Sequence, residues 1–187
     1  MKIITKRLLI RVVKGEDVTD EYVSGLNDPE VNKYLFVRHA KQTVESVMKF
    51  VDQNYKSDGS ILLGLFLNDR LIGTVRLSEI SYFDYCLNLG ICIFDKTQWN
   101  KGLGEEALIR IKKYIFSDMG MHYIEAGIYD ENEFSKRVFE KAGFRLREEV
   151  GNKYRLRDIF VRVLIYKAVN NEFDLKERLS QPRGEKL

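Results

Sequence analysis

The decisive stretch of this sequence is Gln98-Trp99-Asn100-Lys101-Gly102-Leu103-Gly104-Glu105-Glu106-Ala107, which separates two segments of different hydrophobic period. Residues 87–94 before it are nearly all apolar, which predicts a strand covered on both faces. After it, apolar residues recur at helical spacing up to about Ser117. The stretch is therefore predicted to be a turn from a buried strand into an amphipathic helix.

This turn has the features of an anion-binding site. Glycine at 102 and 104 removes the Cβ atoms that would keep a ligand away, and the first N–H groups of a helix can hold phosphate oxygens. Lys101 adds a positive charge. The spacing is neither G-x-G-x-x-G nor G-x-x-x-x-G-K-[ST], so it predicts neither a dinucleotide-binding unit nor a P-loop. A glycine-rich turn without a ligand stays open as the alternative.

On both sides of the turn, the hydrophobic period of the sequence predicts strands and helices that form a mixed α/β sheet in one domain. Thr43 is expected to cap a helix whose apolar stripe packs in the core, and Asp28 and Pro29 are expected to start another. Because ligands bind at the carboxyl ends of parallel strands, the site should lie after Phe94 and Tyr129. The predicted strands are 8–13, 61–67, 71–77, 87–94, 123–129 and 159–166. The predicted helices are 19–26, one from 29, one from 44, 103–117 and 132–141. The apolar stripe of the helix from 44 consists of Val44, Val47, Met48, Val51 and Tyr55.

Composition disfavours several classes of function. The 187 residues are 44% hydrophobic, with 31 Lys+Arg interleaved with 28 Asp+Glu, which is typical of a globular domain and disfavours nucleic-acid binding. No window reaches the roughly 18 apolar residues of a membrane span, and we expect a cytoplasmic protein. Cys86 and Cys92 lack metal-ligand or redox spacing, so no metal is expected.

Several motifs in order resemble one family. They are residues 5–11, 26–31, 71–74, 89–96, 99–108, 130–135 and 138–144. Together they resemble the GNAT superfamily of acetyl-CoA-dependent N-acyltransferases, in its ribosomal-protein (RimJ/RimL-like) acetyltransferase subgroup. The resemblance implies a single-domain GNAT-like α/β fold, with a mixed central sheet flanked by helices and a splayed parallel strand pair at the coenzyme A site. The N-acetyltransferase domain would span residues 1–170, and residues 171–187 would form a polar, peripheral tail.

The resemblance also implies which residues bind acetyl-CoA. Backbone groups of Ile91 and Ile93 would bond the pantetheine arm as an added strand would. Asn132 and Ser135 match the family's Asn-x-x-Ser near the thiol end. The pyrophosphate would be lined, mainly through main-chain N–H groups, by Gln98, Lys101, Gly102, Leu103, Gly104 and Glu105.

The usual proton-handling residues are missing. Asn88 stands where many subgroup members carry glutamate, and Phe139 stands where many superfamily members carry a general-acid tyrosine. A base or a desolvating site must still free the amine's lone pair for direct attack on the thioester. Substitutes within reach are Glu79, Glu125 and Tyr129, besides Asp84, Tyr82 and Tyr85, and a chain of waters that carries the proton to solvent is an equal alternative.

The acceptor pocket is expected to include Tyr34, Phe36, Arg38, Tyr82 and Tyr85. Aromatic rings with hydroxyls and an arginine suit a small primary amine, for which an amino sugar is our first hypothesis. N-terminal acetylation of a ribosomal protein is the close rival. Two other classes stay open: a sensor that binds acyl-CoA without turnover, and a nucleic-acid binder that would not respond to coenzyme A. A homodimer is common in the family and is allowed here.

Overall fold

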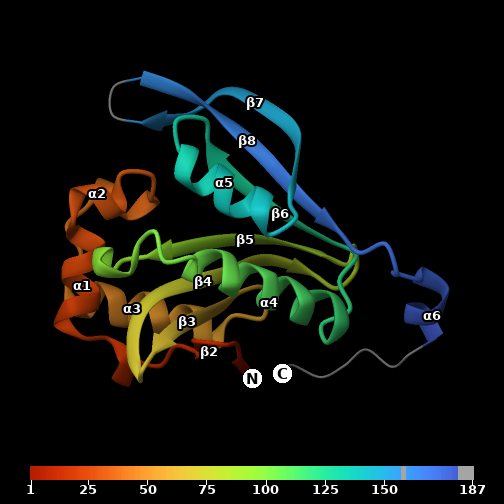
Figure 1. Ribbon diagram of the computed structural model, residues 1–187, viewed down its shortest axis with the longest axis horizontal. Helices are drawn as coiled ribbons and strands as arrows, with labels where there is room; N and C mark the ends of the chain where they lie inside the picture. Colours follow the sequence, from red (N-terminus) through yellow and green to blue (C-terminus); the bar gives the residue numbers. More distant parts are fainter. Residues whose placement is uncertain (157–158, 181–187) are drawn as a thin grey trace.

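The computed structural model describes residues 1–156 and 159–180. Across them the strands form one sheet in the order β1-β2-β3-β4-β5-β6-β8-β7, antiparallel except for β5 beside β6 (Figure 1). The strands are β1 Lys2–Ile4, β2 Leu9–Val12, β3 Ile61–Leu67, β4 Arg70–Ser81, β5 Cys86–Ile93, β6 Tyr123–Tyr129, β7 Arg145–Leu156 and β8 Ile159–Val169. The helices are α1 Asp20–Asn27, α2 Pro29–Asn32, α3 Val44–Lys56, α4 Leu103–Ser117, α5 Glu133–Lys141 and α6 Leu175–Ser180, with 3-10 turns η1 Gly15–Asp17, η2 Phe36–His39 and η3 Lys96–Gln98.

The predicted helix starts are confirmed by their caps. The Thr43 side chain accepts a hydrogen bond from the Ser46 N–H, and Asp28 accepts one from the Glu30 N–H with Pro29 at the first helical position. Each cap satisfies an N–H that the helix leaves without an internal partner. Strands β1 and β7 were not predicted, because β1 is only three residues long and β7 carries charged residues without a period of two.

Two apolar layers hold the sheet. On one face α4 and α5 pack their buried residues against the strands, and both helices lie on the near side in Figure 1. On the other face α1 and α3 form a second cluster around Tyr22, Val51 and Phe94. Tyr22 stacks on Phe94 with ring centroids 4.6 Å apart, and burial raises the pKa of Tyr22 to about 12. The sheet is therefore covered on both faces at β3 and β4, and the second cluster reaches β5 only near its end, at Cys92 and Phe94.

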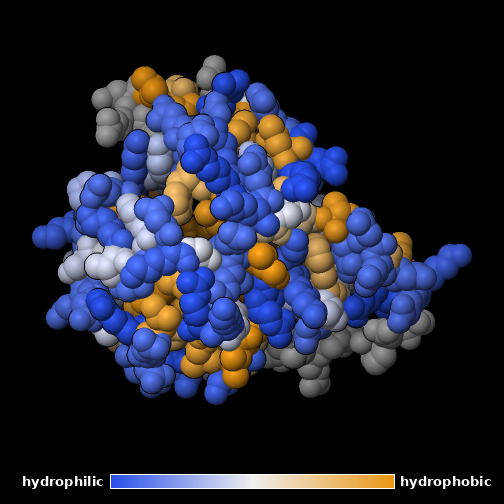
Figure 2. Space-filling view, in the orientation of Figure 1, coloured by the Kyte–Doolittle hydropathy of each residue, from blue (hydrophilic) through white to orange (hydrophobic). Residues whose placement is uncertain are grey.

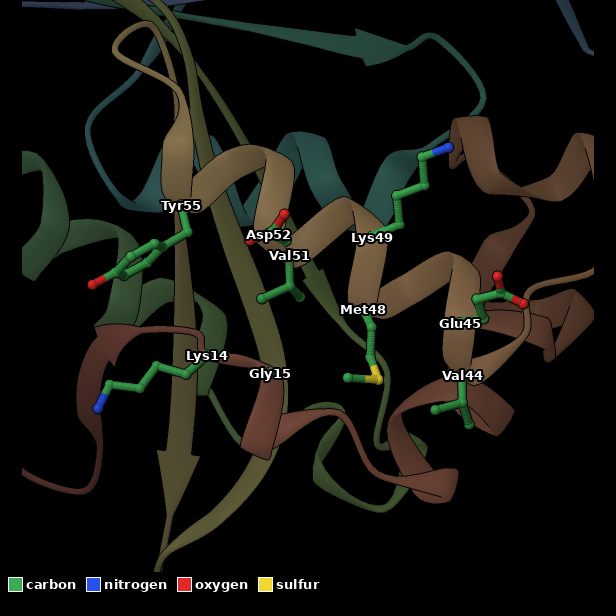
Figure 3. Close-up of a pocket in the computed structure, with 9 residues that line it drawn as sticks. All are labelled: Lys14, Gly15, Val44, Glu45, Met48, Lys49, Val51, Asp52 and Tyr55. Carbon is green, nitrogen blue, oxygen red and sulfur yellow. The ribbon is translucent and has the colours of Figure 1, made fainter.

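The apolar stripe on α3 is only partly core, contrary to the prediction. Val47 and Val51 are buried, whereas Val44, Met48 and Tyr55 are 39%, 46% and 62% exposed. The exposed members line a groove beside Lys14 and Gly15, with Val44, Met48 and Val51 on one side of the helix (Figure 3). The stripe is wider than the contact that α3 makes with the sheet.

One further expectation is wrong. Strand β5 is not covered on both faces: Leu87 and Leu89 are buried, but Gly90 is exposed. The described segment after Asn170 is mostly exposed, and it contacts the domain through Phe173, whose ring stacks on His122 at 4.8 Å and lies 5.2 Å from the Tyr85 ring. Residues 181–187 of the predicted tail lie outside the described residues.

The parallel pair diverges as expected. Its register joins Cys86 to Tyr123, Leu87 to Ile124 and Asn88 to Glu125, and the pairing ends there. Strands β5 and β6 continue for several residues beyond that point, and they separate toward their carboxyl ends in Figure 1. In the part of the chain that the structure describes, no helix is long and apolar enough to cross a membrane, and no group of three His, Cys, Asp or Glu side chains could hold a metal.

Candidate active site

The N-terminus of α4 is open. Gly102 is its N-cap residue in the left-handed conformation with φ +74°, and no side chain caps the helix. Asn100 is also left-handed, at φ +60°, so the chain turns sharply between β5 and α4. The first N–H groups of this 15-residue helix therefore lack a side-chain acceptor, and the helix dipole adds positive potential at the same place. The predicted anion site has the geometry it needs.

Gly104 stands where α4, α5 and β5 meet. A Cβ built on Gly104 would lie 3.5 Å from Val138, 3.6 Å from Ile93 and 3.9 Å from Ile91, which are ordinary contact distances. Neither the backbone nor the packing requires glycine here, so the missing side chain leaves room beside the open helix end. Figure 2 shows the surface hollowed on this face, with apolar residues in the floor of the hollow.

The free edge of β5 faces this space. The Phe94 N–H donates to the Ile72 carbonyl at 3.1 Å, so by strand alternation the main-chain groups of Ile91 and Ile93 point away from β4, toward the diverging β6. The Ile93 carbonyl is taken, however, because the Trp99 indole N–H donates to it at 2.8 Å. The added-strand prediction thus rests on Ile91 and on the Ile93 N–H.

The side chains of the turn are arranged around this edge. Lys101 is exposed and its Nζ donates to Gln98 Oε1 at 3.2 Å, while Glu105 is half-buried in the first turn of α4. Across the gap, Asn132 caps α5 by accepting the Ser135 N–H at 3.1 Å. The structure thus brings all the predicted cofactor residues to the ends of β5 and β6.

Sequence reasoning missed the clamp on this turn. Arg7 Nε donates to Glu106 at 2.7 Å and Arg7 Nη1 donates to the Lys101 carbonyl at 2.8 Å, while Thr5 also donates to Glu106. Partial burial pushes the pKa of Glu106 up, but the hydrogen bonds from Thr5 and Arg7 outweigh it and hold the pKa below its ordinary value. A contact across 99 residues leaves no local signal; only the Thr5-x-Arg7 start could have hinted at it.

Three of the catalytic candidates lie together on the sheet face opposite α4. The Asn88 side-chain amide donates to Glu79 at 2.6 Å, and Asn88 is paired in register with Glu125. Glu79 sits in a β-bulge with φ +52°, a strained conformation that aims its side chain toward Asn88. Glu125 forms an ion pair with Lys167. Phe139 is buried in the core and has no proton to give.

The fourth candidate, Tyr129, meets part of the predicted acceptor pocket. Arg38 donates to the Tyr129 hydroxyl at 3.1 Å, and the Tyr34 ring lies 6.0 Å from the Tyr129 ring. Tyr34 also donates to the Glu131 carbonyl at 3.1 Å. The segment around α2 and η2 therefore reaches the end of β6 and closes one side of the divergence.

The remaining pocket residues are not brought to this cluster. Phe36 is 86% exposed, and the His39 ring packs edge-on against its ring. Tyr82 and Tyr85 lie in the turn before β5, at the paired end of the two strands, where Tyr85 packs on Phe173. Asp84 is in the same turn and accepts from the Ser81 hydroxyl. This separation places Tyr82 and Tyr85 away from the open end of the cleft.

A parallel strand pair that diverges beside an uncapped, glycine-lined helix end is suited to an anionic ligand with an extended arm. The residues fit coenzyme A: helix N–H groups for its pyrophosphate, and a free strand edge for its amide-bearing arm. A family model described as an acetyltransferase (GNAT) domain matches residues 7–145. The chain belongs to the GNAT acetyltransferase family, and acetyl-CoA is its acetyl donor.

Named relatives agree with this family. The chain is 35% identical over 150 residues to the uncharacterized N-acetyltransferase YnaD of Bacillus subtilis, covering 78% of this chain and 83% of YnaD. It is 34% identical over 123 residues to the probable N-acetyltransferase YjcK of the same organism, covering 59% of this chain and 64% of YjcK, just under two thirds of that protein.

Solved structures share the fold. A GNAT-family acetyltransferase from Bacillus anthracis superposes with a TM-score of 0.76 at 27% identity, covering 90% of this chain and 98% of that one. At 20% and 17% identity, the ribosomal-protein-S5-alanine acetyltransferase of Vibrio fischeri and the spermidine N-acetyltransferase of Vibrio cholerae give TM-scores of 0.82 and 0.80. They cover 93% and 89% of this chain and 99% and 98% of their own.

Proposed function

We propose that this acetyltransferase moves the acetyl group of acetyl-CoA to a primary amine by direct attack of the amine on the thioester. The observation that carries the proposal is the open N-terminus of α4 beside the unpaired edge of β5. The first would hold the pyrophosphate and the second the pantetheine arm, which places the thioester where the strands diverge. No side chain need carry the acetyl group.

The amine must lose a proton before it attacks. An alkyl ammonium of pKa about 10.4 costs roughly 4 to 5 kcal/mol to deprotonate at pH 7. We propose Glu79 as the base and Asn88 as the residue that positions it, because their hydrogen bond is 2.6 Å and the bulge directs them together. Glu125 is less suited, since Lys167 holds its carboxylate in an ion pair.

The acceptor we propose is a small amine such as an amino sugar. Its pocket would use Arg38, which donates to the Tyr129 hydroxyl, and Tyr34, whose ring lies beside the Tyr129 ring. N-terminal acetylation of a protein, in a RimJ/RimL-like role, is the rival, supported by the shared fold with a ribosomal-protein acetyltransferase. A non-catalytic acyl-CoA sensor would bind the same ligand without turnover.

The first test is a thermal melt with and without saturating acetyl-CoA. At about one hundred times its dissociation constant, a ligand that binds only the folded state adds roughly 2.7 kcal/mol, which raises Tm by several degrees. Gly104→Val should abolish the rise because its methyl groups fill the space beside α4. Gly151→Val on β7 is the control away from the site, since nothing lies within 4 Å of a Cβ built there.

Melts of both variants without ligand, and of the milder Gly104→Ala, separate a folding defect from a binding defect. A wild-type protein whose Tm does not respond to acetyl-CoA would contradict the proposed function. A response without acetylation of any amine tested would favour the sensor instead.

A further inference from the structure

Where β5 and β6 separate, both strands carry glycine on the face opposite α4. Two residues beyond the last pair, Asn88 and Glu125, come Gly90 and Gly127. Side chains two apart on a strand share a face, so at these two positions neither strand projects a side chain over the divergence on this side. Nothing lies within 4 Å of a Cβ built at Gly90, and one built at Gly127 would meet Val163 at 3.4 Å. An amine can therefore approach the divergence from the face opposite the cofactor site.

Arg76 stands at the edge of this opening. It is directly opposite Gly90 in the β4–β5 register, and residues directly opposed in a sheet project from the same face. Its Nε donates to the Asn54 side-chain oxygen at 3.0 Å, and its guanidinium lies 5.5 Å from the Phe50 ring centre. Both partners come from α3, which covers this face.

The support under Arg76 is rigid. Asn54 is only 5% exposed; its Oδ1 also accepts from Ser60 at 2.9 Å, and its amide donates to the Phe50 carbonyl at 2.8 Å. Arg76 itself is exposed, and among the residues that the structure describes it forms no ion pair. A guanidinium oriented this way through Nε directs its other N–H donors outward, in a geometry that matches a carboxylate or phosphate.

The other charged side chains on this face also favour an anionic acceptor. Both nearby carboxylates are engaged, Glu79 by Asn88 and Glu125 by Lys167. A polycationic acceptor would thus meet Arg76, which has no ion-pair partner among the described residues, and two acids that are already engaged. An acceptor that carries its own anionic group would complete the set of charges.

We propose that the acceptor is a primary amine bearing a carboxylate or phosphate, which Arg76 binds while the amine enters between Gly90 and Gly127. This rests on the proposed function and adds the class of its substrate. Arg76 is then a specificity residue. The chemistry is unchanged: the C–N bond of the amide forms as the C–S bond of the thioester breaks, the amine proton passes to the base, and coenzyme A leaves as a thiolate that takes up a proton.

The test is an acetyl-transfer assay, followed by thiol release, on matched amines. One pair is glucosamine 6-phosphate and glucosamine, and the other is L-alanine and L-alaninamide; spermidine is the cationic comparison and a tripeptide amide represents a protein N-terminus. The enzymes are wild type, Arg76→Gln, Arg76→Lys and, as a control from the opposite face, Arg110→Gln on α4.

We expect the wild-type kcat/KM to be at least tenfold higher for the anionic amine than for its neutral partner in at least one of the two pairs. The pair that shows this difference identifies the anionic group as a phosphate or a carboxylate. Arg76→Gln should raise KM for that member about tenfold with a smaller effect on kcat, Arg76→Lys should recover part of the loss, and Arg110→Gln should match wild type. Two outcomes would overturn the inference about Arg76 and leave the proposed acetyltransferase function in place. One is a preference for a neutral amine, for spermidine or for the peptide. The other is an enzyme whose Tm still rises with acetyl-CoA but which uses neither anionic amine. Loss of both the Tm response and all transfer overturns the proposed function itself.

Discussion

At the scale of single residues, catalysis depends on how two side chains are held. Glu79 was one of several acids within reach in the sequence, and its bulge and its bond to Asn88 distinguish it from Glu125. We expect Glu79→Gln to lower kcat about a hundredfold or more, because the general base is lost while the shape is kept. The measurement is acetyl transfer to the best amine of the panel above, as a function of pH.

The control for this prediction is Glu125→Gln, which should remove the ion pair with Lys167 and leave the pH profile in place. The Tm rise with acetyl-CoA should be unchanged in Glu79→Gln, since Glu79 lies on the opposite face from α4. Equal activity of wild type and Glu79→Gln would show that Glu79 is not the general base, and would favour a chain of waters that carries the amine proton to solvent.

At the scale of elements, the turn before α4 is held by a strand from the far end of the chain. Glu106 accepts hydrogen bonds from Thr5 and Arg7, and these bonds lower its pKa in the folded state. Its contribution to the free energy of unfolding is therefore fully present above about pH 4.5 and is lost as the pH falls through the folded-state pKa. Glu106→Gln should cost about 1 to 2 kcal/mol at pH 7, a figure reduced because the Arg7 side chain is 40% exposed. Urea unfolding at pH 7 and pH 4 measures it.

The difference between wild type and Glu106→Gln should shrink as the pH is lowered, whereas Glu21→Gln on the exposed start of α1 should show little difference at either pH. A difference that grows toward low pH would contradict the lowered pKa.

At the scale of the whole molecule, the two parts of the sheet are joined by a short parallel seam. Only the first residues of β5 pair with β6, so the amides of Ile91 and Ile93 face the divergence, whereas Cys92 faces β4. We expect the Ile91 and Ile93 amides to exchange with solvent at least tenfold more slowly when acetyl-CoA is saturating, because the pantetheine arm supplies the missing partners. Residue-resolved hydrogen exchange by NMR checks this.

Cys92 should be protected with or without acetyl-CoA and serves as the internal reference. If the two isoleucine amides exchange at the same rate in both states, the arm does not bind as an added strand.

Local sequence predicted the elements around the candidate site. The caps at Asp28 and Thr43, the apolar strand before Gly102 and the helix after it were all readable, because each depends on residues a few positions apart. The α3 stripe misled, because the period shows which face is apolar but not how much of that face a neighbour covers. Tyr82 and Tyr85 were assigned to the acceptor pocket because they are close to β5 in sequence. They lie in the turn at the amino end of β5, whereas the cleft opens at its carboxyl end.

Local sequence was enough to predict the turn from strand to helix, the ligand space left by its two glycines and the family to which these motifs belong. Only the tertiary structure decided what surrounds that turn: the link from Arg7 to Glu106, the indole of Trp99 on the Ile93 carbonyl, and Arg76 beside Gly90. Caps and periods are set by torsion angles and hydrogen bonds within a few residues. The Arg7 and Arg76 contacts arise from strand register and helix packing between distant segments, and Trp99 reaches Ile93 only because the turn between them folds back on the strand.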